Sequence, residues 1–279
     1  MTNSIVLVGS NLVADTPIRK KLAGRDAGVE LQIVLEDLLN LWDTKAYNTE
    51  GDNTGTVTVE KQEEGGCDKD TNPDQYLPRD QLKITLKIFL QEANVTELDA
   101  AVTAALAKLS TNRVDILFIA TPPDIYPYVG IGSGGASGVE EEQARHQMQE
   151  LWSGVERLIT EGKVGGAGLS DLNPPTFFNI YEAAKIKPTS VQVNLKSCCV
   201  VPEELSMFVK ENGVTLLTHS DPSEILPEDS LRTMLYPKVA GEASHYSASW
   251  IARYQVHLKD RGVLLQKRYL VHIKHDNDH

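Results

Sequence analysis

The sequence predicts an α/β protein in which parallel strands alternate with helices along most of the chain. Strand and helix patterns alternate with a short period between Glu161 and Asp221. Upstream of this stretch, VDILFIA (Val114–Ala120) is almost wholly apolar, as expected for a parallel strand that is covered on both faces. Strands that alternate with helices of this length indicate βαβ units and a parallel sheet. The alternation alone fits either a closed barrel or an open doubly wound sheet.

The first part of the chain is predicted to hold a strand, a helix and a long loop. The apolar run Ile5–Ser10 predicts a strand or a hairpin arm with a turn directly after it. Apolar residues then recur at helical spacing from Leu31 to Trp42 and form one face. Residues 45–78, which include Cys67, are polar and lack periodicity, so they predict a flexible loop.

The middle of the chain predicts two strands and a helix ahead of a glycine-rich loop. Residues Leu82–Leu90 alternate as a strand does, and Val114–Ala120 forms the next strand. Between them, Thr96 and Asp99 suit a capping box that opens a helix. Residues 124–138 are rich in glycine and serine and predict a second flexible loop.

A long helix and further strand–helix units are predicted for the remainder. Apolar residues from Met148 to Ile159 are spaced for burial along one helix face. Asn173 before two prolines is a good helix start, and Asn212 followed by glycine is a good helix stop. We predict a further helix over Trp250–Leu258 and a last strand over residues 262–270.

Composition places the chain among ordinary globular proteins of acidic character. It has 279 residues, of which 41% are hydrophobic and 24% charged, and its formal net charge is −12 at pH 7. Such a charge repels nucleic acids and anionic membranes, so neither is expected as a partner. No apolar run reaches the roughly 20 residues that cross a bilayer, and the N-terminus lacks the features of a secretion signal. We therefore expect a cytoplasmic protein whose three cysteines form no disulfide framework.

Two patterns that resemble ligand sites are better explained by their context. Residues 271–279 hold three histidines without metal-site geometry, so they predict a solvated tail and no metal. Gly130, Gly132 and Gly135 satisfy the spacing GxGxxG, but prolines and tyrosines separate them from the preceding strand. We interpret these glycines as part of a loop in which partner contact is possible.

Five stretches of the chain carry a resemblance to a known family, namely RDQLKITLK, VDILFIA, EGKVGGAGLSD, SVQVNL and ARYQVHLKDRGVLLQKR. They resemble the aldo-keto reductases, a family of NADPH-dependent TIM-barrel enzymes. The resemblance implies a single (β/α)8 barrel of aldo-keto reductase type over residues 1–279, and it places Lys87 at the family's catalytic lysine. It also implies vestigial cofactor contacts at Ser170, Asp171, Gln192, Lys267 and Arg268.

The same resemblance predicts that the chemistry of a reductase is incomplete. Ala120 stands where the family carries its catalytic histidine, and an alanine side chain cannot hydrogen-bond. A pair at Asp43 and Tyr47 is one residue too short to match the family's aspartate and tyrosine. Asp171 replaces an asparagine and would add negative charge beside a nicotinamide, and His219 is interpreted as a satisfied barrel-end residue. We expect no required cofactor; residual NADPH binding, in a weak reductase or a redox sensor, is the alternative function.

A narrower resemblance, from about residue 78 to about residue 270, is carried by KSCCVVPEEL, VTLLTHSDPSEIL, WIARYQVHLKDRG and VLLQKRYL. This resemblance is to the modifier (regulatory) subunits of glutamate–cysteine ligase. It implies a non-catalytic subunit that forms a heterodimer with the ligase catalytic subunit, improves its use of glutamate and relieves feedback inhibition by glutathione, in glutathione biosynthesis.

Two stretches are candidate contacts with this partner. The first contains Cys198, Cys199, Glu203 and Glu204, and the second begins at Trp250. Adjacent cysteines in an extended segment point to opposite sides. They are therefore either one buried residue and one exposed bystander, or they include an exposed thiol that contacts or bridges the partner.

Overall fold

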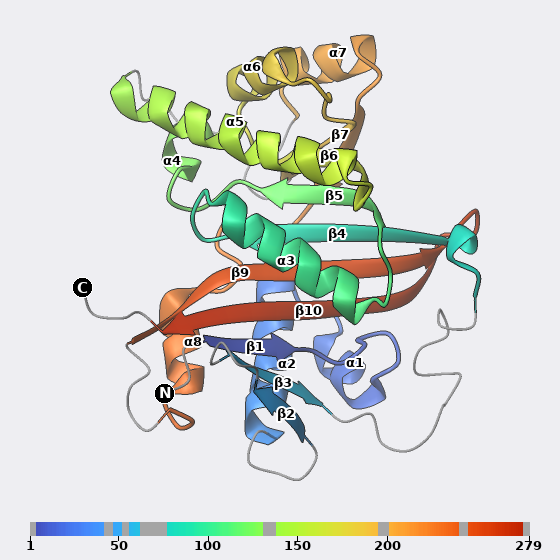
Figure 1. The fold of residues 1–279 in the computed structure, drawn as a ribbon, viewed down its shortest axis with the longest axis vertical. Coiled ribbons are helices and arrows are strands. Elements are labelled where there is room, and N and C mark those ends of the chain that lie inside the picture. Colours follow the sequence, from blue (N-terminus) through green and yellow to red (C-terminus); the bar gives the residue numbers. More distant parts are fainter. Residues whose placement is uncertain are drawn as a thin grey trace. The chain divides into compact units, whose positions relative to one another are not determined.

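The computed structural model describes residues 4–41, 47–51, 56–61, 77–130, 138–194, 201–239 and 245–275 (Figure 1). The chain divides into two compact units. The mixed unit comprises Met1–Ile84 and Glu224–His279, and the parallel unit comprises Thr85–Ser223. The expectation of a single barrel domain over residues 1–279 stays a prediction.

The parallel unit is an α/β structure whose strands follow one another in the sheet in chain order. The strands are β4 (Leu82–Leu90, which enters the unit at Thr85), β5 (Val114–Ala120), β6 (Val164–Ser170), β7 (Ser190–Asn194) and β8 (Thr215–His219). All neighbouring pairs are parallel. The helices are α3 (Val95–Lys108), α4 (Tyr126–Val129), α5 (Val139–Thr160), α6 (Pro174–Ala183) and α7 (Glu203–Glu211). The predicted alternation of parallel strands and helices, and with it the α/β fold class, is confirmed.

Local signals explain most helix ends of this unit, with one correction. The Asn173 side chain accepts a hydrogen bond from Thr176 N at 2.9 Å and opens α6 as predicted. The predicted capping box at Thr96 is wrong, because Asn94 caps α3 and accepts from Thr96 N at 2.8 Å. Asp99 forms an ion pair with Arg157 of α5 instead.

Glycine at position 168 lets β6 and β7 approach each other closely. A Cβ atom on Gly168 would lie 2.4 Å from the carbonyl oxygen of Ser190 and 2.7 Å from a ring carbon of Phe118. No side chain fits at these distances, so glycine is required for this packing of the strands.

The mixed unit combines one parallel pair with antiparallel strands. Its sheet has the order β2 (Tyr47–Gly51), β3 (Thr56–Lys61), β1 (Ser4–Val8), β10 (Val263–His275) and β9 (Tyr246–Leu258), and only β1 and β3 are parallel. The helical elements are α1 (Thr16–Leu22), α2 (Ala27–Leu41), α8 (Glu228–Leu235) and the 3-10 turn η2 (Arg79–Gln81). The predicted first strand and the helix ending near residue 42 are confirmed.

The predicted helix over Trp250–Leu258 is wrong, because these residues form β9. The apolar residues Trp250, Tyr254 and Leu258 recur every four positions, a spacing that fits one face of a helix and also one face of a strand. Their burial settles the difference, since buried Trp250, Ala252, Tyr254 and Val256 alternate with less buried residues from Arg253 onward. Tyr254 lies opposite Arg268 in the antiparallel ladder with β10.

Three predicted loops are corrected in part. Strands β2 and β3 lie within residues 45–78, and the short helix α4 lies within 124–138. β10 continues to His275, so the tail predicted from residue 271 begins later. Residues 62–76, 131–137 and 276–279 lie outside the described part of the chain.

Candidate functional site

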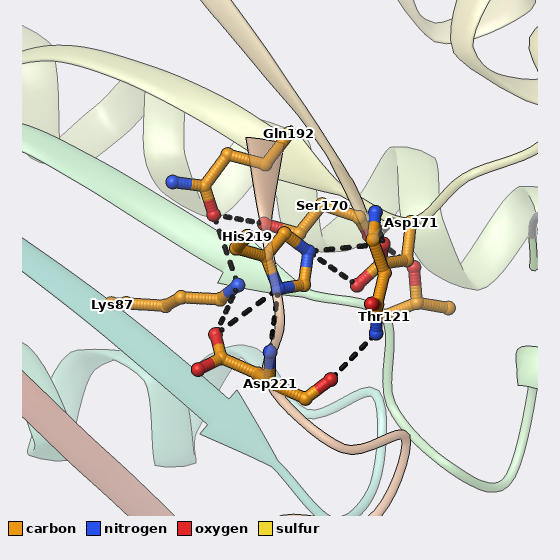
Figure 2. A network of polar contacts seen from close by, with 8 residues as sticks. Lys87, Thr121, Ser170, Asp171, Gln192, His219 and Asp221 are labelled. Carbon is orange, nitrogen blue, oxygen red and sulfur yellow. Dashed lines mark hydrogen bonds and ion pairs between the residues drawn. The ribbon is translucent and has the colours of Figure 1, made fainter. Parts of the chain in front are cut away.

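A network of polar side chains lies near the carboxyl ends of β6, β7 and β8 in the parallel unit (Figure 2). In a parallel sheet these ends share one edge, which brings together residues that are far apart in the sequence. The members are Lys87, Thr121, Ser170, Asp171, Gln192, Asn194, His219 and Asp221.

Lys87 is the buried cation of this network. Its ammonium nitrogen lies 2.9 Å from Asp221 Oδ2 and donates a second hydrogen bond to Gln192 Oε1 at 2.9 Å. Only 4% of the lysine side chain and 6% of the aspartate side chain are exposed. A buried charge is tolerated only when it is paired and hydrogen-bonded, and both conditions hold for this lysine.

His219 lies between the carboxylates of Asp171 and Asp221. Its Nε2 is 3.0 Å from Asp171, and its Nδ1 is 3.3 Å from Asp221 Oδ2. Burial, the largest influence, lowers the pKa of the His219 imidazole, but hydrogen bonds with the two carboxylates outweigh it. The pKa of His219 is therefore raised above its ordinary value of 6.5.

Asp171 also fixes the ends of neighbouring strands. It follows β6 with a positive φ of 66°, a conformation that few residues other than glycine, asparagine and aspartate adopt readily. Its backbone N–H donates to Gln192 O at 2.9 Å, and its Oδ1 accepts from Asn194 N at 2.9 Å. The network therefore connects strand ends and is satisfied within the protein.

The structure brings four of the predicted site residues together and places two elsewhere. Lys87, Ser170, Asp171 and Gln192 belong to one network (Figure 2). Lys267 and Arg268 lie on β10 of the mixed unit. The first forms an ion pair with Glu30 at 2.5 Å, and the second is buried and donates to Gly9 O at 3.4 Å.

The Gln192 carbonyl oxygen and the Ser170 hydroxyl are hydrogen-bonded within the network. Gln192 Oε1 accepts hydrogen bonds from Lys87 Nζ and from Ser170 Oγ, both at 2.9 Å. A carbonyl oxygen has two lone pairs, and both are used here. The Asp171 carboxylate is bonded to His219 and Asn194, so residual NADPH binding stays a prediction without support from this geometry.

Several other predicted residues that the structure describes do not belong to this network. Ala120 ends β5 and is 8% exposed, and Thr121 beside it donates to Ser170 O at 2.7 Å. Glu203 and Glu204 are exposed in the first turn of α7. Gly130 forms a β-bridge with Leu172, so the first glycine of the GxGxxG run has a local structural role.

Five predicted residues lie outside the described part of the chain, and a sixth is described only in its backbone. Asp43, Gly132, Gly135 and the two cysteines Cys198 and Cys199 lie outside the described residues, and for Tyr47 in β2 only the backbone is described. The suggested pair of Asp43 and Tyr47 and the two interpretations of the cysteines therefore stay predictions.

Asp221 and Asn194 are parts of the site that the sequence-based prediction missed. Both lie at or just after the carboxyl end of a strand, where side chains of parallel sheets converge. Their position at the ends of predicted strands is the sequence feature that could have indicated them. The interpretation of His219 as a satisfied barrel-end residue is confirmed by its contacts with both aspartates.

The described residues contain neither a membrane-spanning helix nor a metal-binding cluster. Within them, no helix has the length and apolar character needed to cross a membrane. In the same part of the chain, no group of three or more histidine, cysteine, aspartate or glutamate side chains is arranged to hold a metal ion.

Comparison with known proteins identifies similar sequences. A sequence model of the aldo/keto reductase family matches residues 69–221. The glutamate–cysteine ligase regulatory subunit of Homo sapiens is 34% identical over 205 residues, which cover 73% of this chain and 69% of the human protein. The NAD(P)H-dependent D-xylose reductase of Kluyveromyces lactis is 24% identical over 153 residues, 51% of this chain and 46% of that enzyme.

Solved structures give a weaker likeness. The aldose reductase from Schistosoma japonicum matches with a TM-score of 0.38 and 24% identity, over 52% of this chain and 47% of that chain. An aldo/keto reductase from Brucella melitensis matches with a TM-score of 0.39 and 19% identity, over 60% of this chain and 57% of that chain. This chain therefore spans about half the length of these solved reductases.

Proposed function

Because the chain belongs to the family of glutamate–cysteine ligase regulatory subunits, and with them to the aldo/keto reductase family, we propose that it is a regulatory subunit of glutamate–cysteine ligase. The observation that carries this proposal is the 34% identity to the human regulatory subunit over 69% of that protein. The chain would bind a ligase catalytic subunit in the cytoplasm as a heterodimer, improve its use of glutamate and relieve its inhibition by glutathione.

The geometry around Lys87 supports a non-catalytic role. Carbonyl reduction needs a proton donor at the developing alkoxide and a partner that tunes the donor. Lys87 is instead held by Asp221 and Gln192 inside the network, and Ala120 offers no polar side-chain atom. Both features favour a fold that is used for binding.

A regulatory subunit must bind two states of its partner unequally, because only differential affinity shifts an equilibrium. We propose the first turn of α7 as part of the surface that does so. Glu203 and Glu204 are exposed there, and Met207 on the same helix is 56% exposed. Two carboxylates beside an exposed apolar side chain would suit a basic patch with an apolar centre on the catalytic subunit.

Reconstitution tests the assignment directly. The purified chain is mixed with a glutamate–cysteine ligase catalytic subunit, and complex formation, the KM for glutamate and inhibition by glutathione are measured. A complex with a lower KM and weaker inhibition is expected. If no complex forms and neither constant moves, the assignment fails.

Charge reversal then tests the surface. Glu203→Lys with Glu204→Lys should weaken the complex and make the remaining binding less sensitive to salt. The matched control reverses Glu228 and Asp229, an exposed acidic pair in the first turn of α8. Equal affinities for the α7 variant and the unaltered chain would remove α7 from the interface without affecting the assignment.

The same preparation addresses the alternative function. Turnover of a carbonyl substrate with NADPH would contradict the non-catalytic role. Quenching of protein fluorescence by NADPH without turnover would instead favour a redox sensor.

A further inference from the structure

Four hydrogen bonds join the ends of β6, β7 and β8 into a closed ring. His219 Nε2 contacts Asp171 at 3.0 Å, and Asp171 Oδ1 accepts from Asn194 N at 2.9 Å. The Asn194 side-chain nitrogen donates to Asp221 O at 2.5 Å, and Asp221 N donates to His219 Nδ1 at 3.2 Å. Every residue of the ring contributes to two of these bonds, so loss of one contact affects the others (Figure 2).

The last bond of the ring depends on the protonation of His219. In the neutral imidazole, Nε2–H donates to Asp171 and Nδ1 is free to accept from the backbone N–H of Asp221. In the imidazolium both ring nitrogens are donors. Nδ1–H then points to Asp221 Oδ2 at 3.3 Å, and the backbone N–H of Asp221 loses its acceptor on the ring.

The charges around the ring change with the same proton. In the described part of the chain, the charged groups that face His219 are Lys87 from β4, Asp171 after β6 and Asp221 after β8. With an imidazolium, two cations balance two carboxylates. With a neutral imidazole, these groups together carry one net negative charge. Lys87 Nζ and His219 Nδ1 both approach Oδ2 of Asp221, so the lysine becomes the principal partner of that oxygen when His219 is neutral.

We propose that His219 is a proton-operated latch. When protonated, its ring forms one ion pair with Asp171 at the end of β6 and a second with Asp221, which follows it after β8; when neutral, it keeps a hydrogen bond to Asp171 and exchanges the second ion pair for a backbone hydrogen bond from Asp221. Asn194, at the end of β7, is bonded to both aspartates and receives the change through them. The latch thereby makes the hydrogen bonding at this edge of the parallel unit sensitive to pH over the range in which His219 titrates.

The sign of the effect follows from the contacts. The pKa of His219 is raised in the folded chain, because its bonds to the carboxylates outweigh the opposing influence of burial. Its contribution to stability is complete below the ordinary value of 6.5 and is lost as pH rises through the higher folded value. The latch is therefore closed below pH 6.5 and opens as pH rises through the higher pKa of His219 in the folded chain.

Nuclear magnetic resonance of histidine-labelled protein tests the latch on the isolated chain, without a ligase partner. The chain has seven histidines, and the His219→Gln variant assigns the relevant signal. The His219 ring should titrate with a midpoint above 6.5, and the backbone amides of Asn194 and Asp221 should shift with the same midpoint. In His219→Gln the two amide signals should no longer shift over the pH range in which His219 titrates in the unaltered chain.

The matched control is His146→Gln, which alters an exposed histidine on α5 of the same unit. It should leave the midpoint of His219 and both amide titrations unchanged. Thermal unfolding should show His219→Gln losing most stability relative to the unaltered chain at low pH, with the difference falling as pH rises. A His219 midpoint at or below 6.5, or amides that do not titrate with the ring, would overturn the proposal.

A second variant covers the case in which His219→Gln does not fold. Asp171→Asn keeps the side-chain shape, and asparagine tolerates the positive φ of this position. Because it removes one negative partner of the ring, the His219 midpoint should fall towards 6.5. An unchanged midpoint in Asp171→Asn would equally refute the latch.

Discussion

The Lys87→Met variant is expected to lose a large part of the stability of the parallel unit. Methionine has a similar length and keeps the apolar stem, but it leaves the Asp221 carboxylate buried without its ammonium partner. Breaking one side of a buried pair costs about 3–5 kcal/mol. For a domain of this size such a loss lowers the Tm by on the order of 10 °C.

A double-mutant cycle separates the ion pair from the packing of the side chain. Asp221→Asn keeps an oxygen near His219 while it removes the charge, so Lys87→Met with Asp221→Asn leaves no unpaired charge between these two positions. The double variant should therefore be more stable than Lys87→Met alone. Lys210→Met is the matched control, because this lysine is exposed on α7 and should cost less than about 0.5 kcal/mol.

Urea denaturation followed by circular dichroism gives the four free energies of the cycle. The reasoning is refuted if Lys87→Met lowers the free energy of unfolding by less than about 1 kcal/mol, because removing the partner of a buried carboxylate should destabilise the fold by more than this. It is also refuted if the two single losses simply add in the double variant, since additivity would mean that Lys87 and Asp221 do not interact.

Three further predictions concern positions where local geometry is demanding. Asn94→Ala should destabilise the chain by about 1 kcal/mol in thermal unfolding, and Thr96→Ala should cost clearly less, because Asn94 is the cap of α3. Gly168→Ala should cost about 1–3 kcal/mol, since the added carbon would lie 2.4 Å from the carbonyl oxygen of Ser190; unchanged stability would mean that the strands separate without penalty. Glu156→Ala should cost about 1–3 kcal/mol because this carboxylate accepts two backbone N–H groups at 2.6 and 2.9 Å, and Glu156→Gln, which keeps an acceptor, should restore most of the loss.

Repetition made the parallel unit predictable, whereas isolated elements were harder. Each strand from β4 to β8 is followed by a helix pattern, so the units support one another in the sequence. β9 has no such neighbour, and its four-residue spacing from Trp250 to Leu258 fits both a helix and a strand. β3 was missed within a polar segment although TVTVE alternates as a strand does, because the composition around it indicated a loop.

The candidate site was predictable in part of its members but not in its connections. Resemblance to the reductases identified Lys87, Ser170, Asp171 and Gln192, and all four lie in one network. No local pattern reports that the counter-ion of Lys87 is Asp221, because the pair forms only once β4 and β8 belong to the same sheet. Pairings of this kind depend on topology, which residue patterns alone do not determine.

The network also suggests why a fold that serves reductases suits a regulator. A binding surface gains affinity when its supporting backbone is already fixed, because less conformational freedom is lost on association. The ring through Asp171, Asn194 and Asp221 fixes the ends of β6, β7 and β8 from within, and α7 lies in the connection between β7 and β8. The charged groups at these strand ends thus hold the base from which Glu203 and Glu204 are presented to solvent. We infer that loosening this base, by Lys87→Met or by neutralising His219, would weaken a partner bound at α7 even though neither side chain reaches that surface.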